Sequence, residues 1–470
     1  MSEITGWTAS EALRQIGAGR ISAREYAEAL LAQCERSGGL NAFIHLDPER
    51  VLDAASRALP GGGRLAGLPV PVKDNFDTAD MPTTGGTPGL RDHRPARNAP
   101  VLQRLVDEGA CVMGKLNMHE LAFGITSNNG AFGPARNPYD PARIPGGSSG
   151  GSGAAVAARM APVAMGTDTG GSVRVPAALC GVAGFRPTTG RYSQAGIVPI
   201  SSTRDTAGPL ARSVEDLALF DGVIAGVPGD LPDVSLKGVR IGVPRGHFYE
   251  NLHPETSRVA EAALTALGEA GAVLVEADMP DVPKLDGAAG FPVALFETVV
   301  ELNRYLSESG LPLDLASLAA AVASPDVAGL LQGVLTPEGA IPEPVYREAL
   351  TRTRPALQAA YARYFASNDV VAAIFPTTPL PASLIGEDET VELNGEPVPT
   401  FLTFIRNTGP SSLAGIPGVT LPAGLSSDGL PIGMELDGPA GSDRALLAWS
   451  AAVEAALPAT PAPRSEEPRN

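Results

Sequence analysis

Histidine and cysteine are scarce in this chain of 470 residues, which contains five histidines and three cysteines. Cys34, Cys111 and Cys180 are too few and too scattered for a disulfide framework or a zinc site. His119-Glu120 could begin a zinc-protease HExxH motif, but position 123 is Phe, so no metal site is expected. The thiols are therefore expected to be reduced, as is typical of a cytoplasmic protein.

Positive charge and long apolar runs are also lacking. The chain has 35 Lys and Arg against 52 Asp and Glu, a net charge of −17, and no basic block. This balance argues against nucleic acid or an anionic membrane as partner. No apolar run reaches the ~18 residues of a membrane span, and the N-terminus lacks the pattern of a secretory signal. We expect a cytoplasmic protein with neither nucleic-acid nor membrane partners.

What the chain has in quantity is hydrophobic residues, which make up 44% of it and allow a large core. Apolar stretches at 236–244 and 272–276 are predicted strands, and a predicted helix at 254–270 lies between them. Alternation of this kind is typical of an α/β fold in which helices cover a central sheet.

The absence of an internal repeat or a convincing linker predicts a single domain over residues 1–457. Within it, residues 280–345 form a less regular pattern of helices broken by Pro and Gly. We interpret this region as a helical cap over the functional site. Residues 458–470, rich in Pro, Glu and Arg, are predicted to be a disordered tail.

Glycine and hydroxyl residues concentrate between residues 144 and 190. Two runs, GGSSGGSG at 146–153 and GTDTGGSVR at 166–174, are separated by an Ala/Val-rich segment predicted to be helical. A flexible linker would not contain that helix, so the glycines indicate close approach of the backbone. The runs match neither the phosphate-binding nor the dinucleotide-binding glycine pattern.

The residues themselves favour acyl transfer by a serine and a lysine. Residues 146–150 match the G-x-S-x-G nucleophile elbow, but that mechanism needs a late histidine, and the last two are His247 and His253. Lys73 follows the apolar Val-Pro-Val run, and a lysine carried inward can lose its proton and act as a base. Glycine-rich backbone before Ser172 could donate N–H groups to an oxyanion.

These motifs resemble those of the amidase signature family over about residues 8–457. Lys73 lies in GLPVPVKDNFD, Ser148 in GGSSGGSGAA, and Ser172 in GTDTGGSVRVPAALCGVAGFRPT. The spacings, 75 residues from Lys73 to Ser148 and 24 from Ser148 to Ser172, are those of the family's Ser–Ser–Lys triad. The resemblance implies the amidase-signature fold, an α/β fold whose large central mixed β-sheet is flanked on both faces by helices.

The resemblance also implies a role for each motif residue. Ser172 would be the nucleophile, Lys73 the base, and Ser148, after a cis peptide bond, the proton relay; no metal or organic cofactor is implied. The acyl-enzyme would be hydrolysed by water. Two further sets are implied: an oxyanion hole from the backbone N–H groups of Thr169, Gly170, Gly171 and Ser172, and loop support from Gly147, Ser149, Asp168 and Arg174. A purely structural ion pair is the alternative for Asp168 and Arg174.

The C-terminal motifs at 375–381, 390–395, 403–408 and 429–439 are most similar to those of indoleacetamide and mandelamide hydrolases. This implies a small aryl or arylalkyl amide as substrate, and by family resemblance a homodimer. The acyl pocket would be lined by the loop 404–413 and by Ala122, Phe123, Ile125 and Thr126, although a core role is the alternative for Phe123 and Phe404.

Three other functions are kept open. The first is a broad aryl acylamidase, esterase or carbamate hydrolase with the same triad. The second is the glutaminase A subunit of a tRNA-dependent amidotransferase, and the third is a non-catalytic binding protein on the same fold.

Overall fold

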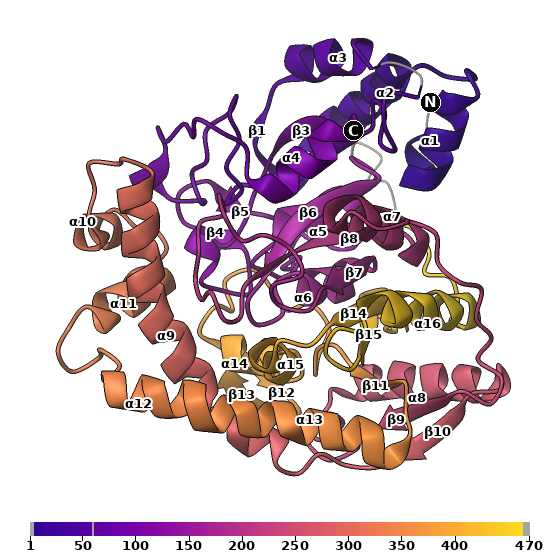
Figure 1. Cartoon of the computed structure of the whole chain (residues 1–470), viewed down its shortest axis with the longest axis vertical. Coiled ribbons are helices and arrows are strands. Elements are labelled where there is room, and N and C mark those ends of the chain that lie inside the picture. The colour runs from indigo at the N-terminus through magenta and orange to yellow at the C-terminus, as the bar shows by residue number, and fades with distance from the viewer. Residues whose placement is uncertain (1–3, 59–60, 464–470) are drawn as a thin grey trace.

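A mixed sheet of eleven strands runs through the computed structural model, which describes residues 4–58 and 61–463 (Figure 1). The strand order is β1-β3-β2-β6-β8-β7-β14-β15-β11-β9-β10. These strands are β1 (Phe43–Leu46), β2 (Pro69–Lys73), β3 (Cys111–Leu116), β6 (Val163–Asp168), β7 (Ala183–Arg186), β8 (Thr206–Ala211), β9 (Arg240–Val243), β10 (Val273–Glu276), β11 (Ala372–Pro376), β14 (Gly418–Leu425) and β15 (Pro431–Asp437). Two small hairpins pair β4 (Asn128–Asn129) with β5 (Gly133–Pro134), and β12 (Thr390–Leu393) with β13 (Glu396–Pro399).

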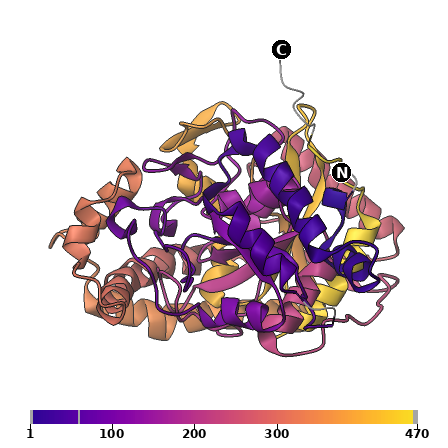
Figure 2. The same ribbon diagram turned by 90° about the horizontal axis from the view of Figure 1, so that it is seen from above.

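Helices flank this sheet (Figures 1 and 2), which confirms the predicted α/β fold with a large central mixed sheet. The pair α5 and α6 packs on strands from β2 to β15, and the pair α7 and α16 packs on β7, β8, β14 and β15. The helices are α1 (Ala9–Gly17), α2 (Ala23–Arg36), α3 (Pro48–Ser56), α4 (Pro100–Asp107), α5 (Gly150–Ala157), α6 (Arg174–Cys180), α7 (Val214–Ala225), α8 (Pro254–Glu269), α9 (Val282–Glu308), α10 (Leu315–Ala320), α11 (Pro325–Val334), α12 (Glu343–Glu348), α13 (Arg354–Asn368), α14 (Thr400–Ile405), α15 (Gly409–Ala414) and α16 (Asp443–Ala456).

The predicted strand–helix–strand unit is present as β9, α8 and β10. The two strands pair in parallel, with Val273 opposite Arg240, and α8 packs against β10. Pro254 begins the helix, where its missing N–H leaves no hydrogen bond unmade. The alternating pattern of the sequence therefore located this unit to within a few residues.

Residues 280–345 are more regular than expected, because α9 continues through Pro292 as one helix of 27 residues. Pro292 therefore does not break the helix, and α9 ends at Glu308, two residues before Gly310. The helix buries apolar side chains in two separate clusters, one around Val282 and Val293 and the other around Leu302 and Leu306. This packing outweighs the hydrogen bond that Pro292 cannot donate. In Figure 1, α10 and α11 lie beside α9 at one side of the molecule.

The three cysteines are free and buried. Burial raises the pKa of Cys34 to about 12 and that of Cys111 to about 11, and it raises the pKa of Cys180 as well. Within residues 4–58 and 61–463, none of the helices combines the length and apolar character needed to cross a membrane. Most of the predicted tail, residues 464–470, lies outside the described residues.

Candidate active site

Lys73 is the last residue of β2 and lies at the same sheet edge as the end of β6. The two strands run in parallel, with Val72 opposite Met165, so the side chains that follow them meet at one edge. The Lys73 Nζ is fully buried and donates to Ser148 Oγ at 2.7 Å and to Thr167 Oγ1 at 2.8 Å. Burial lowers the pKa of Lys73 to about 7, against the opposing effect of the nearby carboxylates. The amine can thus be neutral near neutral pH and accept a proton.

Ser148 lies in the glycine-rich turn before α5, the helix predicted between the two glycine runs. The Gly147–Ser148 peptide is cis, as the resemblance implied. A side chain at Gly147 would place its Cβ 2.9 Å from the Ser127 hydroxyl, so only glycine fits this close contact. Ser149 ties the turn to β6 because its hydroxyl donates to the Thr167 carbonyl and accepts from the Thr167 N–H, both at 3.2 Å.

Ser172 precedes α6, and its side chain reaches a cavity of about 430 Å³. It is only 8% exposed, and no hydrogen bond joins its hydroxyl to that of Ser148 within the described part of the chain. Relay hydrogen bonds in a free enzyme commonly shorten only when substrate binds. Of the implied relay, the structure therefore shows the Lys73–Ser148 hydrogen bond, while Ser172 faces the cavity.

The implied oxyanion hole differs from the structure at Gly171. Its N–H donates to Asp168 Oδ1 at 2.9 Å, so this donor is occupied by an internal carboxylate. Over the described residues, the N–H groups of Thr169, Gly170 and Ser172 make no such internal bond. Gly171 has a φ of +130°, and a Cβ there would fall 2.2 Å from Thr408 Oγ1, so the loop requires glycine.

A network of buried ion pairs holds the glycine loop 168–174 in place. The fully buried Asp168 carboxylate accepts from Arg174 Nε and from Arg186 Nη1, each at 3.0 Å. Arg174 also forms an ion pair with Glu435 of β15. Burial alone would raise the pKa of Asp168, but the two guanidinium groups outweigh it and hold the pKa well below its usual range. The network joins the loop, β7 and β15 into one unit.

We expect Arg174→Met to lower the free energy of unfolding by about 3–5 kcal/mol, because it leaves Asp168 and Glu435 as buried charges without this partner. Urea unfolding followed by circular dichroism measures the change. The matched control is Arg57→Met, which removes an exposed arginine paired with Asp53 and should leave the midpoint unchanged. Equal midpoints for both variants would contradict a structural role for the network.

The cavity in front of Ser172 is lined by the four single residues that the resemblance placed in the acyl pocket and by part of the loop 404–413. Ala122, Phe123, Ile125 and Thr126 all line it. Phe404 does not, because it is fully buried in an apolar cluster, and its alternative core role is the one observed. Ile405, Arg406 and Gly409 of the predicted loop 404–413 do line it, whereas the lining residues on α9 were missed from the sequence: Asp286, Gly290, Phe291, Ala294 and Leu295.

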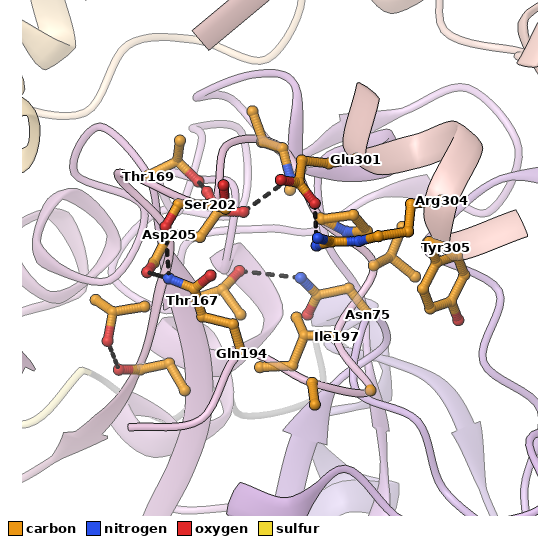
Figure 3. A pocket seen from close by; sticks show the side chains of 18 of the residues that line it. Asn75, Thr167, Thr169, Gln194, Ile197, Ser202, Asp205, Glu301, Arg304 and Tyr305 are labelled. Carbon is orange, nitrogen blue, oxygen red and sulfur yellow. Dashed lines mark hydrogen bonds and ion pairs between the residues drawn. The ribbon is translucent and has the colours of Figure 1, made fainter. Parts of the chain in front are cut away.

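A second cavity, of about 270 Å³, is lined by Thr167, the residue that accepts from Lys73 (Figure 3). Thr167 and Asn75 lie at its wall, and Asn75 Nδ2 donates to Thr167 Oγ1 at 3.0 Å. On its other side α9 contributes the Glu301–Arg304 ion pair. Thr167, which binds the lysine, was missed from the sequence. Its position beside Asp168 in the second glycine run was the signal that could have found it. The sequence did not show that β2, which carries Lys73, lies next to β6.

Comparisons with known proteins agree with this architecture. The model of the Amidase family matches residues 25–447. The chain is 45% identical to an indoleacetamide hydrolase of Agrobacterium vitis, over 93% of this chain and 94% of that protein. It is 38% identical to a mandelamide hydrolase of Pseudomonas putida, over 97% and 92% of the two chains. The crystal structure of a native peptide amidase from Stenotrophomonas maltophilia superposes with a TM-score of 0.83 at 30% identity, covering 98% and 99%.

Because these matches cover nearly all of this chain and of the matched proteins, no large part of the chain lies outside the matched region. The chain belongs to the amidase signature family. It is an amidohydrolase that acts on amides.

Proposed function

We propose that this chain hydrolyses the C–N bond of small aryl and arylalkyl amides, with Ser172 as nucleophile, Ser148 as relay and Lys73 as base. One observation carries the proposal: the fully buried Lys73, whose pKa is lowered to about 7, donates at 2.7 Å to the hydroxyl of Ser148. A base with a pKa near the working pH is the most effective in proton transfer.

The cycle follows from these positions. Neutral Lys73 takes the proton of Ser148 as Ser148 takes that of Ser172, and the Ser172 oxygen attacks the amide carbon. The N–H groups of Thr169, Gly170 and Ser172 then stabilise the oxyanion. As the C–N bond breaks, the Ser148 hydroxyl gives its proton to the leaving amine and regains one from Lys73. Water, deprotonated through the same relay, then attacks the acyl ester formed on Ser172. As the bond between the acyl carbon and Ser172 Oγ breaks, the relay returns that proton to Ser172 and the carboxylic acid is released.

The lining of the cavity supports an aromatic acyl group. Apolar side chains dominate around Ser172, and Phe123, Ile125, Phe291, Leu295 and Ile405 are among them. A largely apolar cavity with a few polar groups is typical of small-molecule sites. The names of the similar indoleacetamide and mandelamide hydrolases support primary amides of arylacetic acids as the substrate class.

A substrate panel tests this proposal. We expect kcat/KM for phenylacetamide, mandelamide and indole-3-acetamide to exceed that for acetanilide, an aryl carbamate and glutamine by on the order of 10²-fold, because the cavity suits an aromatic acyl group. Ammonia release and product chromatography measure the rates. Fastest cleavage of the anilide or carbamate would support the broad acylamidase, esterase or carbamate hydrolase instead. Cleavage of glutamine alone would support the amidotransferase subunit.

The resemblance and the composition support further proposals on domain organisation, location and oligomeric state. We propose one domain over residues 1–457 in which residues 280–345 act as a cap. α9 supports the cap because it contributes side chains to both cavities. We also propose a cytoplasmic location and a homodimer, and sedimentation equilibrium tests the latter.

A further inference from the structure

A single carboxylate on α9 projects into the cavity that holds Ser172. Asp286 lies in the second turn of this helix, and Gly290, Phe291 and Ala294 continue the same face along the cavity wall. It packs beside Gly409 of α15, another lining residue, where a Cβ would lie 3.4 Å from Asp286 Oδ2. The carboxylate is therefore part of the wall that a bound acyl group would contact.

Three carboxylates line this cavity, and among the described residues only that of Asp286 makes neither a hydrogen bond nor an ion pair within 4.0 Å. Asp326 Oδ2 lies 2.9 Å from His119 Nε2. Asp388 accepts from Thr126 Oγ1 and from Asn128 Nδ2, each at 2.7 Å. Asp286 Oδ1, by contrast, is buried with no hydrogen-bond partner.

The nearest cation is directed elsewhere. Arg204 also lines the cavity, but its Nε donates to the Thr169 carbonyl at 3.0 Å and its Nη1 to the Gly290 carbonyl at 2.8 Å. Burial raises the pKa of Asp286, and the charge of Arg204 opposes this effect. A buried acceptor left without a donor is unfavourable. Because the Asp286 side chain lines the cavity, a ligand donor that reaches its carboxylate from the cavity would remove that cost.

We propose that Asp286 accepts a hydrogen bond from a donor on the acyl part of the substrate, either a ring N–H or a hydroxyl. The inference rests on the proposed function and deepens it. This hydrogen bond would favour arylacetic amides that carry an N–H group in the aromatic ring or a hydroxyl group on the α-carbon. Phe291 and Leu295 on the same helix would contact the apolar remainder of that group. Asp286 is thus a specificity-determining residue.

Two substrate pairs isolate this hydrogen bond. Indole-3-acetamide is compared with benzofuran-3-acetamide, which replaces the ring N–H by oxygen, and mandelamide is compared with phenylacetamide. We expect the wild type to prefer the donor-bearing member of at least one pair by on the order of 10- to 100-fold in kcat/KM, as a hydrogen bond to a charged group allows. Asp286→Ala should bring that ratio to about 1, because no acceptor remains.

Controls separate the loss of the substrate hydrogen bond from a general loss of folded, active enzyme. Each ratio is measured on one enzyme preparation, so partial unfolding cancels. Asp286→Asn keeps a carbonyl acceptor and should retain part of the preference. Asp281→Asn changes an exposed carboxylate just before the same helix and should keep the wild-type ratio.

The outcomes are distinct. Equal rates within both pairs in the wild type, or a uniform loss for all four amides in Asp286→Ala, would overturn the proposal while leaving aryl amide hydrolysis intact. If the wild type hydrolyses none of the four amides, the proposed function fails, and this inference fails with it.

Discussion

Ser172→Ala is expected to lower kcat for phenylacetamide by on the order of 10⁶-fold, the scale seen when a nucleophilic serine is removed. The reason is positional, because Ser172 carries the hydroxyl that faces the cavity directly after the glycine loop. Steady-state assay of ammonia release measures the loss. Since only one small side chain changes, the far-ultraviolet circular dichroism spectrum and the melting temperature should be those of the wild type.

Ser152→Ala is the matched control for this variant. Ser152 lies in the other glycine run, is equally a buried serine, and donates to the Met165 carbonyl at 3.1 Å. It should keep activity within about tenfold of the wild type, since it loses one neutral hydrogen bond. A fluorophosphonate probe should label the wild type at Ser172 and fail to label Ser172→Ala. Unlabelled wild-type protein would support the non-catalytic binding protein, and an active Ser172→Ala would refute the nucleophile assignment.

Lys73→Ala should reduce kcat/KM by on the order of 10³-fold at pH 7.5, as expected for the loss of a general base. The wild-type pH profile gives the sharper test. Because burial lowers the pKa of Lys73 to about 7, the neutral base is scarce below that pH and predominates above it. Activity should therefore rise as the pH increases through about 7 and level off above it, and this ascending limb should be absent from the variant.

The exposed Lys237→Ala provides the comparison for the lysine variant. It should preserve both the rate and the ascending limb, because it changes the net charge equally without touching the site. A limb near pH 7 that persists in Lys73→Ala would assign the titration to another group. The buried Lys115, which pairs with Asp74 at 3.3 Å, would then be the first group to examine.

The sequence carried the motif residues but not the contacts between distant elements. Lys73, Ser148 and Ser172 could be found because their local motifs are specific, and the sheet class because strand and helix patterns alternate. Thr167 as the partner of Lys73 could not be found, since that contact requires β2 beside β6. The engagement of the Gly171 N–H with Asp168 depends on the arginines that fix the carboxylate.

The α9 residues illustrate the same limit. Proline and glycine in the segment indicated broken helices, yet tertiary packing keeps α9 continuous through Pro292. The continuous helix aligns Asp286 and Phe291, which precede Pro292, with Ala294 and Leu295, which follow it, along one cavity wall. Phe404 shows the converse, because an aromatic residue in a motif similar to that of aryl amide hydrolases turned out to fill the core.

The buried, weakly acidic thiols make this chain suited to site-specific labelling. Maleimides react with thiolates, and Cys34, Cys111 and Cys180 are both inaccessible and held in the thiol form. A cysteine placed at Val300, which is 51% exposed on α9, would react alone without removing any native residue of the site. A fluorophore there would report directly how α9 responds when an amide fills the cavity.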